Sequence, residues 1–461
     1  MPNTSIFSKI SQKYKDEMIT NIKKWCAINS QYDEKTRDEI NPFGKGVSNA
    51  LNFFADLAAK DGFEVRNYDN YVVEATYGSG EKNITIMAHA DVVPEGSGWD
   101  QNPFEVVEKK GVLYGRGVAD DKGPALSCYY ALKALKEANM LISKNYRIRF
   151  LVGGNEERGS LCMEHYFKTL KKQQPTYGFS PDSSFPLIFA EKGIFNFEAS
   201  KEINIRGLLS IHGGVASNSV MEKCTVRMDI SDTIIPFILE NYPEAQIYTA
   251  DDVVSITFVG LAAHGSVPEE GKNAGIMALK FLAKYTKHKD FAKAVELFED
   301  VYGKGVNGYA NSREMGRNSL NLGLINYDQG HPLSMIINFR FVNGVNEKTL
   351  KNNIKEACKP FSVKCSVSSP LLYYNRRSKL VKTLMKAYAD ETGDHESKPL
   401  STGGGTYAKE AQNVLAFGME FAGRNPKMHA VGENVSIEDL MQAMAIYAHA
   451  IYGLGQLIDE D

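Results

Sequence analysis

The spacing of apolar residues divides the chain into an alternating helix and strand region, a strand-rich region, and a closing helical region. Helical spacing predicts two helices between Ile6 and Ala59, and another from Lys122 to Met140. Short apolar runs that end in polar residues predict buried strands over 83–93 and 147–154. This alternation predicts an α/β domain with a mixed, mostly parallel sheet flanked by helices.

After Lys192 the pattern changes to spaced, strand-like segments with a long helical stretch from Ala274 to Phe298 between them. These features predict an α+β domain. Helical periodicity returns at 378–392 and again from Ser436 to Leu454, so the second domain interrupts the first. We therefore expect two domains: a catalytic domain formed by residues 1–190 and 375–461, and an inserted lid domain formed by residues 191–374.

The composition excludes several classes of protein. Hydrophobic residues make up 43% and charged residues 24%, as in ordinary globular proteins. The formal net charge of -3 gives no electrostatic reason to expect nucleic acid or an anionic membrane as a partner. The sequence has no basic leader with an apolar core and no apolar run long enough to cross a membrane. Six scattered cysteines form no C-x-x-C pair, which favours free thiols in the cytoplasm.

Polar residues with catalytic potential follow the predicted strands. His89 and Asp91 are two residues apart and so share one face of an extended chain, where a carboxylate can accept the imidazole's second N–H. Asp120 and its neighbouring aspartate lie between glycines before a helix, and Glu156 and Glu157 follow another strand. One carboxylate of such a pair can bind metal while the other handles protons. A solvated strand end explains His89 and Asp91 equally well, and a solvated loop is the better explanation of either acidic pair alone, but three such clusters after three strands favour a site.

Two more loop residues complete a possible ligand set. Asp182 lies between two prolines, and His429 lies in the loop MHAVGEN before the last predicted helix. Histidine and carboxylate ligands together suit zinc, manganese or cobalt, and no cysteine is required.

The motifs HADVVP, GWDQNPF, LYGRGVADDKGP, NEERGS, SPD and MHAVGEN occur in this order over nearly the whole chain. In this order they resemble the co-catalytic metallopeptidases that include carboxypeptidase G, aminoacylase and the bacterial dipeptidases. The segments DVVPEGSGW and STGGGTYAKE, with the chain length, most resemble PepV-like dipeptidases of the Xaa-His dipeptidase or carnosinase type.

This resemblance implies a role for each residue of the metal site. Asp91 would support His89, Glu156 would be the general base, and the Asp120–Asp121 peptide would be cis. The implied ligands are His89 and Asp182 on one metal, Glu157 and His429 on the other, and Asp120 bridging both.

The resemblance also assigns residues of the inserted domain. His264 would stabilise the transition state, and closure of the two domains about hinges near Glu191 and Tyr373 would bring it to the substrate. Arg340 suits a carboxylate, because guanidinium offers a planar fork, although an arginine on an alternating strand can equally face solvent. The residues that would hold substrate oxygens and the terminal carboxylate are Asn218, Arg340, Gly403, Gly404 and Gly405. The insertion is longer than the lid module of dimeric relatives, which favours a monomer.

The expected function is hydrolysis of dipeptides with two divalent ions, zinc or manganese, with cobalt as an in vitro substitute. Two ions about 3.5–4 Å apart activate a bridging water, and Glu156 takes its proton. An aminoacylase or deacetylase acting on N-acyl amino acids is the alternative within this class. A non-catalytic peptide-binding protein is the alternative outside it, and the presence of every expected ligand argues against that reading.

Overall fold

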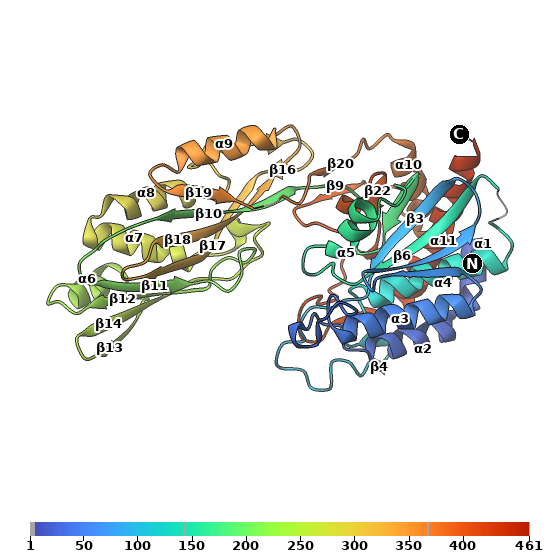
Figure 1. Ribbon diagram of the computed structural model, residues 1–461, viewed down its shortest axis with the longest axis horizontal. Helices are drawn as coiled ribbons and strands as arrows, with labels where there is room; N and C mark the ends of the chain where they lie inside the picture. The colour runs from blue at the N-terminus through green and yellow to red at the C-terminus, as the bar shows by residue number, and fades with distance from the viewer. Residues whose placement is uncertain (1–4, 142–143, 367, 461) are drawn as a thin grey trace. The chain divides into compact units, whose positions relative to one another are not determined.

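The computed structural model describes residues 5–141, 144–366 and 368–460, and these form two compact units (Figure 1). The first unit comprises Met1–Phe189, Tyr374–Leu400 and Gly405–Asp461. The second comprises Ala190–Tyr373 and the short segment Ser401–Gly404. Apolar periodicity could not reveal that this four-residue segment belongs to the second unit, because it contains no apolar residue.

The main sheet of the first unit is parallel at its centre and antiparallel at its edges. Strands β6, β3, β7 and β22 run parallel to one another, whereas β1, β2, β9 and β20 pair antiparallel with their neighbours. The α/β class is therefore confirmed, with the parallel pairing confined to the centre. The strands in spatial order are β1 (Glu64–Tyr68), β2 (Val72–Gly78), β6 (Tyr146–Gly153), β3 (Lys82–His89), β7 (Tyr177–Ser180), β22 (Val414–Ala416), β9 (Ile188–Glu191) and β20 (Leu372–Tyr373), and β21 (Leu400–Thr402) pairs with β9.

The amino-terminal region forms three helices rather than the two that its periodicity predicts: α1 (Ile6–Gln12), α2 (Lys15–Cys26) and α3 (Lys45–Lys60). The extra break falls at Tyr14, whose ring is buried and whose hydroxyl donates to the Glu137 carboxylate at 2.6 Å. This tertiary contact holds Tyr14 outside helical geometry, at ψ 2°, although the apolar spacing continues across it. A spacing argument cannot detect such a break.

Helices α4 (Lys122–Glu137) and α11 (Ile437–Glu460) pack against each other and against β3, and α10 (Lys379–Thr392) packs on α11. Helix α3 contacts β1 and β2 (Figure 1). Nearly every residue of α4 is buried, which explains why small and apolar side chains dominate its sequence. Within the described residues, no helix has the length and apolarity that crossing a membrane requires.

The second unit is an antiparallel sheet with helices packed on it, as an α+β domain requires. Helices α7 (Ala274–Thr286) and α8 (Lys289–Phe298) contact β17, α9 (Glu347–Ala357) contacts β19, and α6 (Ile234–Asn241) follows β12 (Figure 1). The strands in spatial order are β13 (Gln246–Ala250), β14 (Val253–Val259), β12 (Lys223–Asp229), β11 (Leu208–Gly213), β17 (Ser319–Asp328), β18 (Leu333–Phe341), β10 (Gly193–Lys201) and β19 (Ser362–Cys365).

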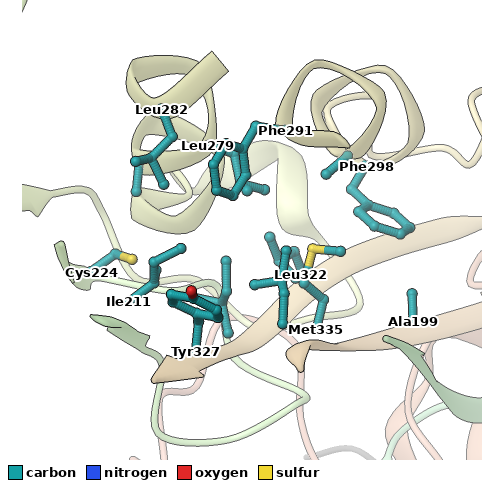
Figure 2. Packing of buried hydrophobic residues seen from close by; sticks show 14 of the residues in the cluster. Ala199, Ile211, Cys224, Leu279, Leu282, Phe291, Phe298, Leu322, Tyr327 and Met335 are labelled. Atoms are coloured by element: carbon teal, nitrogen blue, oxygen red, sulfur yellow. The ribbon is translucent and has the colours of Figure 1, made fainter. Parts of the chain in front are cut away.

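The core of the second unit explains why the long helical stretch is two helices. Leu279 and Leu282 of α7 and Phe291 and Phe298 of α8 all point towards the sheet (Figure 2). One straight helix could not aim both sets at the sheet, and the chain turns at Lys287, which has a φ of 54°. The side chain of His288 then caps α8 by accepting from the Asp290 N–H.

Short elements connect the larger ones. The helical turns are η1 (Glu34–Thr36), α5 (Leu161–Glu164), η2 (His165–Thr169), η3 (Pro268–Glu270) and η4 (Tyr407–Glu410). The short strands are β4 (Val107–Lys109), β5 (Val112–Tyr114), β8 (Ser183–Ser184), β15 (Asn311–Ser312), β16 (Gly316–Arg317), β23 (Met419–Glu420) and β24 (Asn434–Ser436).

Candidate metal centre

The polar residues singled out in the sequence converge at one edge of the first unit's sheet. Strand β3 ends at His89, β6 is followed by Glu156 and Glu157, and β7 is followed by Asp182. These strands are neighbours and parallel, so their carboxyl ends lie at the same edge. Loops before α4 and before β24 bring Asp120 and His429 to this edge.

The five predicted ligands form two groups that share one carboxylate. His89, Asp120 and Asp182 place their ligand atoms within 4.8 Å of one another, and so do Asp120, Glu157 and His429. The two oxygens of Asp120 face different histidines: Oδ1 lies 3.1 Å from Nε2 of His89, and Oδ2 lies 2.7 Å from Nε2 of His429. The sharing of Asp120 is the arrangement expected of a bridging ligand.

The donor set fits divalent cations. Burial, together with the nearby charge of Asp120, raises the pKa of Asp182 to about 6 and the pKa of Glu157 to about 7. Burial opposes ionisation of Asp120 as well, but hydrogen bonds from His429 and His89 outweigh it and lower its pKa. Crowded carboxylates with this tendency to hold protons would be stabilised in their ionised form by bound cations. Carboxylate and imidazole ligands are those that zinc and manganese accept.

Glu156 lies beside the two groups and belongs to neither. Burial and the charge of Asp182 raise the pKa of Glu156 well above its ordinary value. A carboxylate with a raised pKa takes a proton more readily near neutral pH, which is the property a general base needs.

Asp91 contacts His89 through both its main chain and its side chain. The nearest acceptor for Nδ1 of His89 is the main-chain oxygen of Asp91, at 2.9 Å, and its carboxylate lies farther away, at 3.5 Å. The carboxylate also accepts the main-chain N–H groups of Glu156, at 3.0 Å, and Glu157, at 3.1 Å. Asp91 therefore holds His89 mainly through its backbone, with its carboxylate 3.5 Å from the same nitrogen, and holds the two glutamates through its side chain.

The sequence did not single out Glu433, which organises the loop that carries Asp120. Its side chain is fully buried, and Oε1 accepts the main-chain N–H groups of Gly117, Ala119 and Asp120 at 2.9–3.2 Å. Arg116 donates to Oε2 at 2.6 Å. Glu433 is four residues from His429, so one short segment supplies a ligand and holds the loop of another. An acidic residue in a polar loop normally indicates solvent exposure, which is why its position gave no signal.

Asp121 was also missed as a contributor. Its Oδ2 accepts the main-chain N–H of His89 at 3.0 Å, and the Asp120–Asp121 peptide is cis, which confirms the conformation that the resemblance implies. The two neighbouring aspartates thus serve different ends. Asp120 faces the histidines, and Asp121 anchors the end of β3.

In the second unit, hydrogen bonds connect the predicted substrate residues in two pairs of segments: the segment of His264 with that of Asn218, and Arg340 with Gly403. His264 is exposed, and its Nδ1 lies 2.6 Å from Oγ of Ser266. The main-chain oxygen of Asn218 accepts the N–H of Gly265, the residue after His264, at 2.7 Å. Arg340 is only 3% exposed, and it donates to Asn338 Oδ1 and to the main-chain oxygen of Gly403. Burial lowers the pKa of Arg340 to about 10. The predicted glycine run divides between the units, because Gly403 and Gly404 belong to the second and Gly405 to the first.

Comparisons with known proteins agree with this geometry. A Bacillus subtilis (strain 168) protein named "Putative dipeptidase YtjP" is 32% identical over 461 residues, covering 96% of this chain and 98% of that protein. A Staphylococcus aureus (strain COL) protein with the same dipeptidase designation is 32% identical over 464 residues, covering 96% and 98%.

Solved structures share the fold. The dipeptidase Dug1p of Saccharomyces cerevisiae superposes with a TM-score of 0.60 at 16% identity, covering 98% of each chain. Human carnosine dipeptidase 1 superposes with a TM-score of 0.58 at 15% identity, covering 99% of this chain and 100% of that one. The model of peptidase family M20/M25/M40 matches residues 85–453. This chain therefore belongs to peptidase family M20/M25/M40 and is a peptidase.

Proposed function

We propose that this peptidase hydrolyses dipeptides with the help of two divalent metal ions. The observation that carries the proposal is the pair of ligand groups that share Asp120, with the separate carboxylate of Glu156 beside them. The full-length similarity to proteins designated dipeptidases supports the substrate class. The substrate is a small molecule, and we expect neither nucleic acid nor a membrane as a partner.

The residues of each group would hold one ion. His89 and Asp182 would bind the first, Glu157 and His429 the second, and Asp120 both. When bound, two such ions supply Lewis acidity that activates water and polarises a carbonyl. Zinc and manganese are the ions that we expect, because the ligands are imidazole and carboxylate.

Glu156 would move the proton. Its carboxylate would take a proton from the attacking water and later deliver it to the nitrogen of the leaving amine. The pKa of Glu156, raised by burial and by Asp182, suits both steps, since the group must gain and then lose the proton. Asp91 would keep the Glu156 backbone in place through its bond to the N–H of that residue.

Residues of the second unit would complete substrate recognition. The guanidinium of Arg340 is held through Nε and Nη1, and we propose that it pairs with the terminal carboxylate of the dipeptide. His264 would stabilise the oxyanion of the tetrahedral intermediate. Asn218 and the backbone of Gly403, Gly404 and Gly405 would hold substrate oxygens.

The decisive experiment removes and restores the metal. The full chain is treated with a chelator and then assayed with Ala-Ala, β-Ala-His and N-acetyl-Ala while manganese, zinc or cobalt is added back. We expect Ala-Ala cleavage to return with metal and to remain absent in Glu156→Gln. Hydrolysis of N-acetyl-Ala in place of Ala-Ala would establish the aminoacylase alternative. A metal-loaded protein that cleaves none of the three would refute the proposed substrate class.

We also propose that the protein acts as a monomer in the cytoplasm. All six cysteines are free thiols, and five of them are buried, which suits a reducing compartment. Light scattering on the purified chain tests the oligomeric state: a mass near 51.2 kDa supports a monomer, and twice that mass refutes it.

A further inference from the structure

A cavity of about 180 Å³ adjoins the metal centre within the first unit. Asp182 lines it, together with Ala119 and Met428, the residues that precede Asp120 and His429 in the chain. The volume is about ten times the ~15 Å³ that a single water needs, so a substrate group can enter. Any group held beside Asp182 can therefore extend into this cavity.

Glu420 also lines this cavity. Its position is set by the pairing of its strand with the strand that follows Asp182. Strand β8 follows Asp182 directly and pairs in parallel with β23, so that Glu420 lies opposite Ser184. Paired residues project to the same face of a sheet. Accordingly, Oγ of Ser184 donates to Oε2 of Glu420 at 3.0 Å and fixes the carboxylate.

The described charged residues that line the cavity provide no cation to pair with the Glu420 carboxylate. Arg424 is the cation among the lining residues, and it already donates to Oδ1 of Asp439 through Nε and Nη2. Among the described residues, Glu420 has no cationic partner, and the hydroxyl of Ser184 is its hydrogen-bond donor. Much of the remaining wall is apolar, including Phe421, Pro426 and Val435. A fixed carboxylate in a partly apolar cavity is suited to a small cation that brings an apolar substituent.

We propose that Glu420 binds the free ammonium group of the dipeptide and that the cavity takes the side chain of its first residue. This inference rests on the proposed dipeptidase function and names the group that recognises the amino terminus. In a dipeptide of α-amino acids, the ammonium nitrogen and the scissile carbonyl carbon are attached to the same α-carbon. A carbonyl placed at the group containing Asp182 therefore brings the ammonium to the adjoining cavity.

The chemistry separates dipeptides from N-acyl amino acids. A charge-assisted hydrogen bond to a carboxylate is about twice as strong as a neutral one. An N-acyl amino acid has no ammonium, so it would leave the Glu420 carboxylate desolvated without a cation. Glu420 thereby disfavours the alternative substrate and favours a free amino terminus.

The test compares two substrates that differ at this one group, using the metal-loaded full chain. Ala-Ala carries the ammonium, and lactoyl-alanine carries a hydroxyl in its place. Glu420→Gln should lower kcat/KM for Ala-Ala by about 10- to 100-fold, as expected when a hydrogen bond to a charged group is lost. The same variant should not lower kcat/KM for lactoyl-alanine, because that substrate presents no ammonium and is no longer opposed by an unpaired carboxylate.

Glu64→Gln is the matched control, since it removes the same charge from exposed strand β1 and should leave both substrates unaffected. Glu420→Asp retains the charge and should recover part of the Ala-Ala activity. The wild-type preference for Ala-Ala over lactoyl-alanine should decline above pH ~8, where an α-amino group loses its proton. Glu420→Gln should abolish that decline, which a merely structural effect would not do.

The outcomes separate this inference from the proposed function. An equal fall for both substrates in Glu420→Gln, or no fall for Ala-Ala, overturns the role of Glu420 while the dipeptidase function stands. A wild-type protein that cleaves neither substrate when loaded with metal overturns both.

Discussion

The two units differ in what they bury. The first unit buries charged groups at the carboxyl edge of its sheet, among them His89, Asp120 and Glu433. The main cluster that fills the second unit is apolar, and Leu279, Phe291 and Tyr327 belong to it. Buried charge is costly unless it is paired and hydrogen-bonded, whereas buried apolar surface stabilises directly. Apolar packing therefore dominates the interior of the second unit, although Arg340 is buried there, whereas the first unit gathers several buried charged groups at one edge of its sheet.

The hydrogen bonds of the first unit show how that charge is tolerated. Asp91 accepts two main-chain N–H groups, and Glu433 accepts three in addition to Arg116. Each carboxylate is thus held by backbone that belongs to another part of the site. Changes to these groups should affect metal binding or rate, whereas changes to the apolar cluster should affect stability alone.

The largest expected effect is on the rate, at Glu156. Glu156→Gln should lower kcat for Ala-Ala by about 10²- to 10⁴-fold, because a general base contributes this much. The metal content, measured by mass spectrometry, should equal that of the wild type, since Glu156 lies outside both ligand groups. Glu157→Gln is the contrasting variant and should lose metal. Normal activity in metal-loaded Glu156→Gln would contradict its role as the base.

The next effect is on stability and concerns the second unit. Leu279 is fully buried in the apolar cluster, on the side of α7 that faces the sheet (Figure 2). Leu279→Ala should lower the free energy of unfolding by about 2–5 kcal/mol, through lost burial and the cavity left behind. Denaturant titration measures this change, and the metal content should stay the same.

Leu239→Ala is the control for that substitution, because Leu239 belongs to the same unit but is 60% exposed. It should change the free energy of unfolding by no more than about 0.5 kcal/mol. Equal losses in the two variants would mean that burial in the cluster does not determine the stability of this unit.

A smaller effect is expected at Glu433. Glu433→Gln keeps an acceptor for the Asp120 loop but removes the charge that pairs with Arg116. Partners that orient metal ligands typically contribute 10- to 100-fold in metal affinity, so we expect a loss in that range. Competition with a chromogenic chelator gives the dissociation constant.

Glu438→Gln provides the comparison, since Glu438 is exposed and only five residues from Glu433. Its metal affinity should match that of the wild type. If Glu433→Gln binds metal as tightly as the wild type does, then the buried charge is structural and the two units differ less than proposed.

The sequence predicted the two candidate ligand groups more completely than the residues that surround them. His89, Asp120, Glu157, Asp182 and His429 follow strands or occupy loops, and the parallel order of β6, β3 and β7 brings them together. Such residues are recognisable because a polar cluster interrupts an apolar pattern. Glu433 interrupts no pattern, and its burial depends on a loop that packs over it, so periodicity could not identify it.

For the fold as well, local patterns identified some features and missed those that depend on tertiary contacts. Apolar runs identified β3, β6 and α4, whose burial is nearly complete. They did not identify the breaks at Tyr14 and Lys287, because each break depends on tertiary contacts rather than on local apolar spacing. The membership of Ser401–Gly404 in the second unit likewise comes from tertiary contacts, which short polar segments do not encode locally.

The smallest expected effect is a pH dependence of stability confined to the metal-free first unit. Burial and Asp120 raise the pKa of Glu157 from its ordinary value of 4.5 to about 7. Hydrogen bonds with Asp120 and Glu157 raise the pKa of His429 from 6.5 to about 11. Between each pair of values the folded state binds more protons than the unfolded state, so the free energy of unfolding falls as the pH rises.

Both shifts act in the same direction, over pH 4.5 to 7 for Glu157 and above pH 6.5 for His429. Calorimetry on chelator-treated protein should show the Tm of the first unit falling by a few degrees from pH 5 to pH 8, since each kcal/mol lost corresponds to roughly 2–4 °C in a domain of this size. His429→Gln should reduce the part of the slope above pH 6.5, because the variant has no imidazole to titrate. The apolar cluster of the second unit has no such titrating pair, so its transition should shift less over the same range. A Tm that stays constant or rises over this range in the metal-free first unit would mean that its carboxylates are ionised without metal, and the proposed contrast between the two interiors would fail.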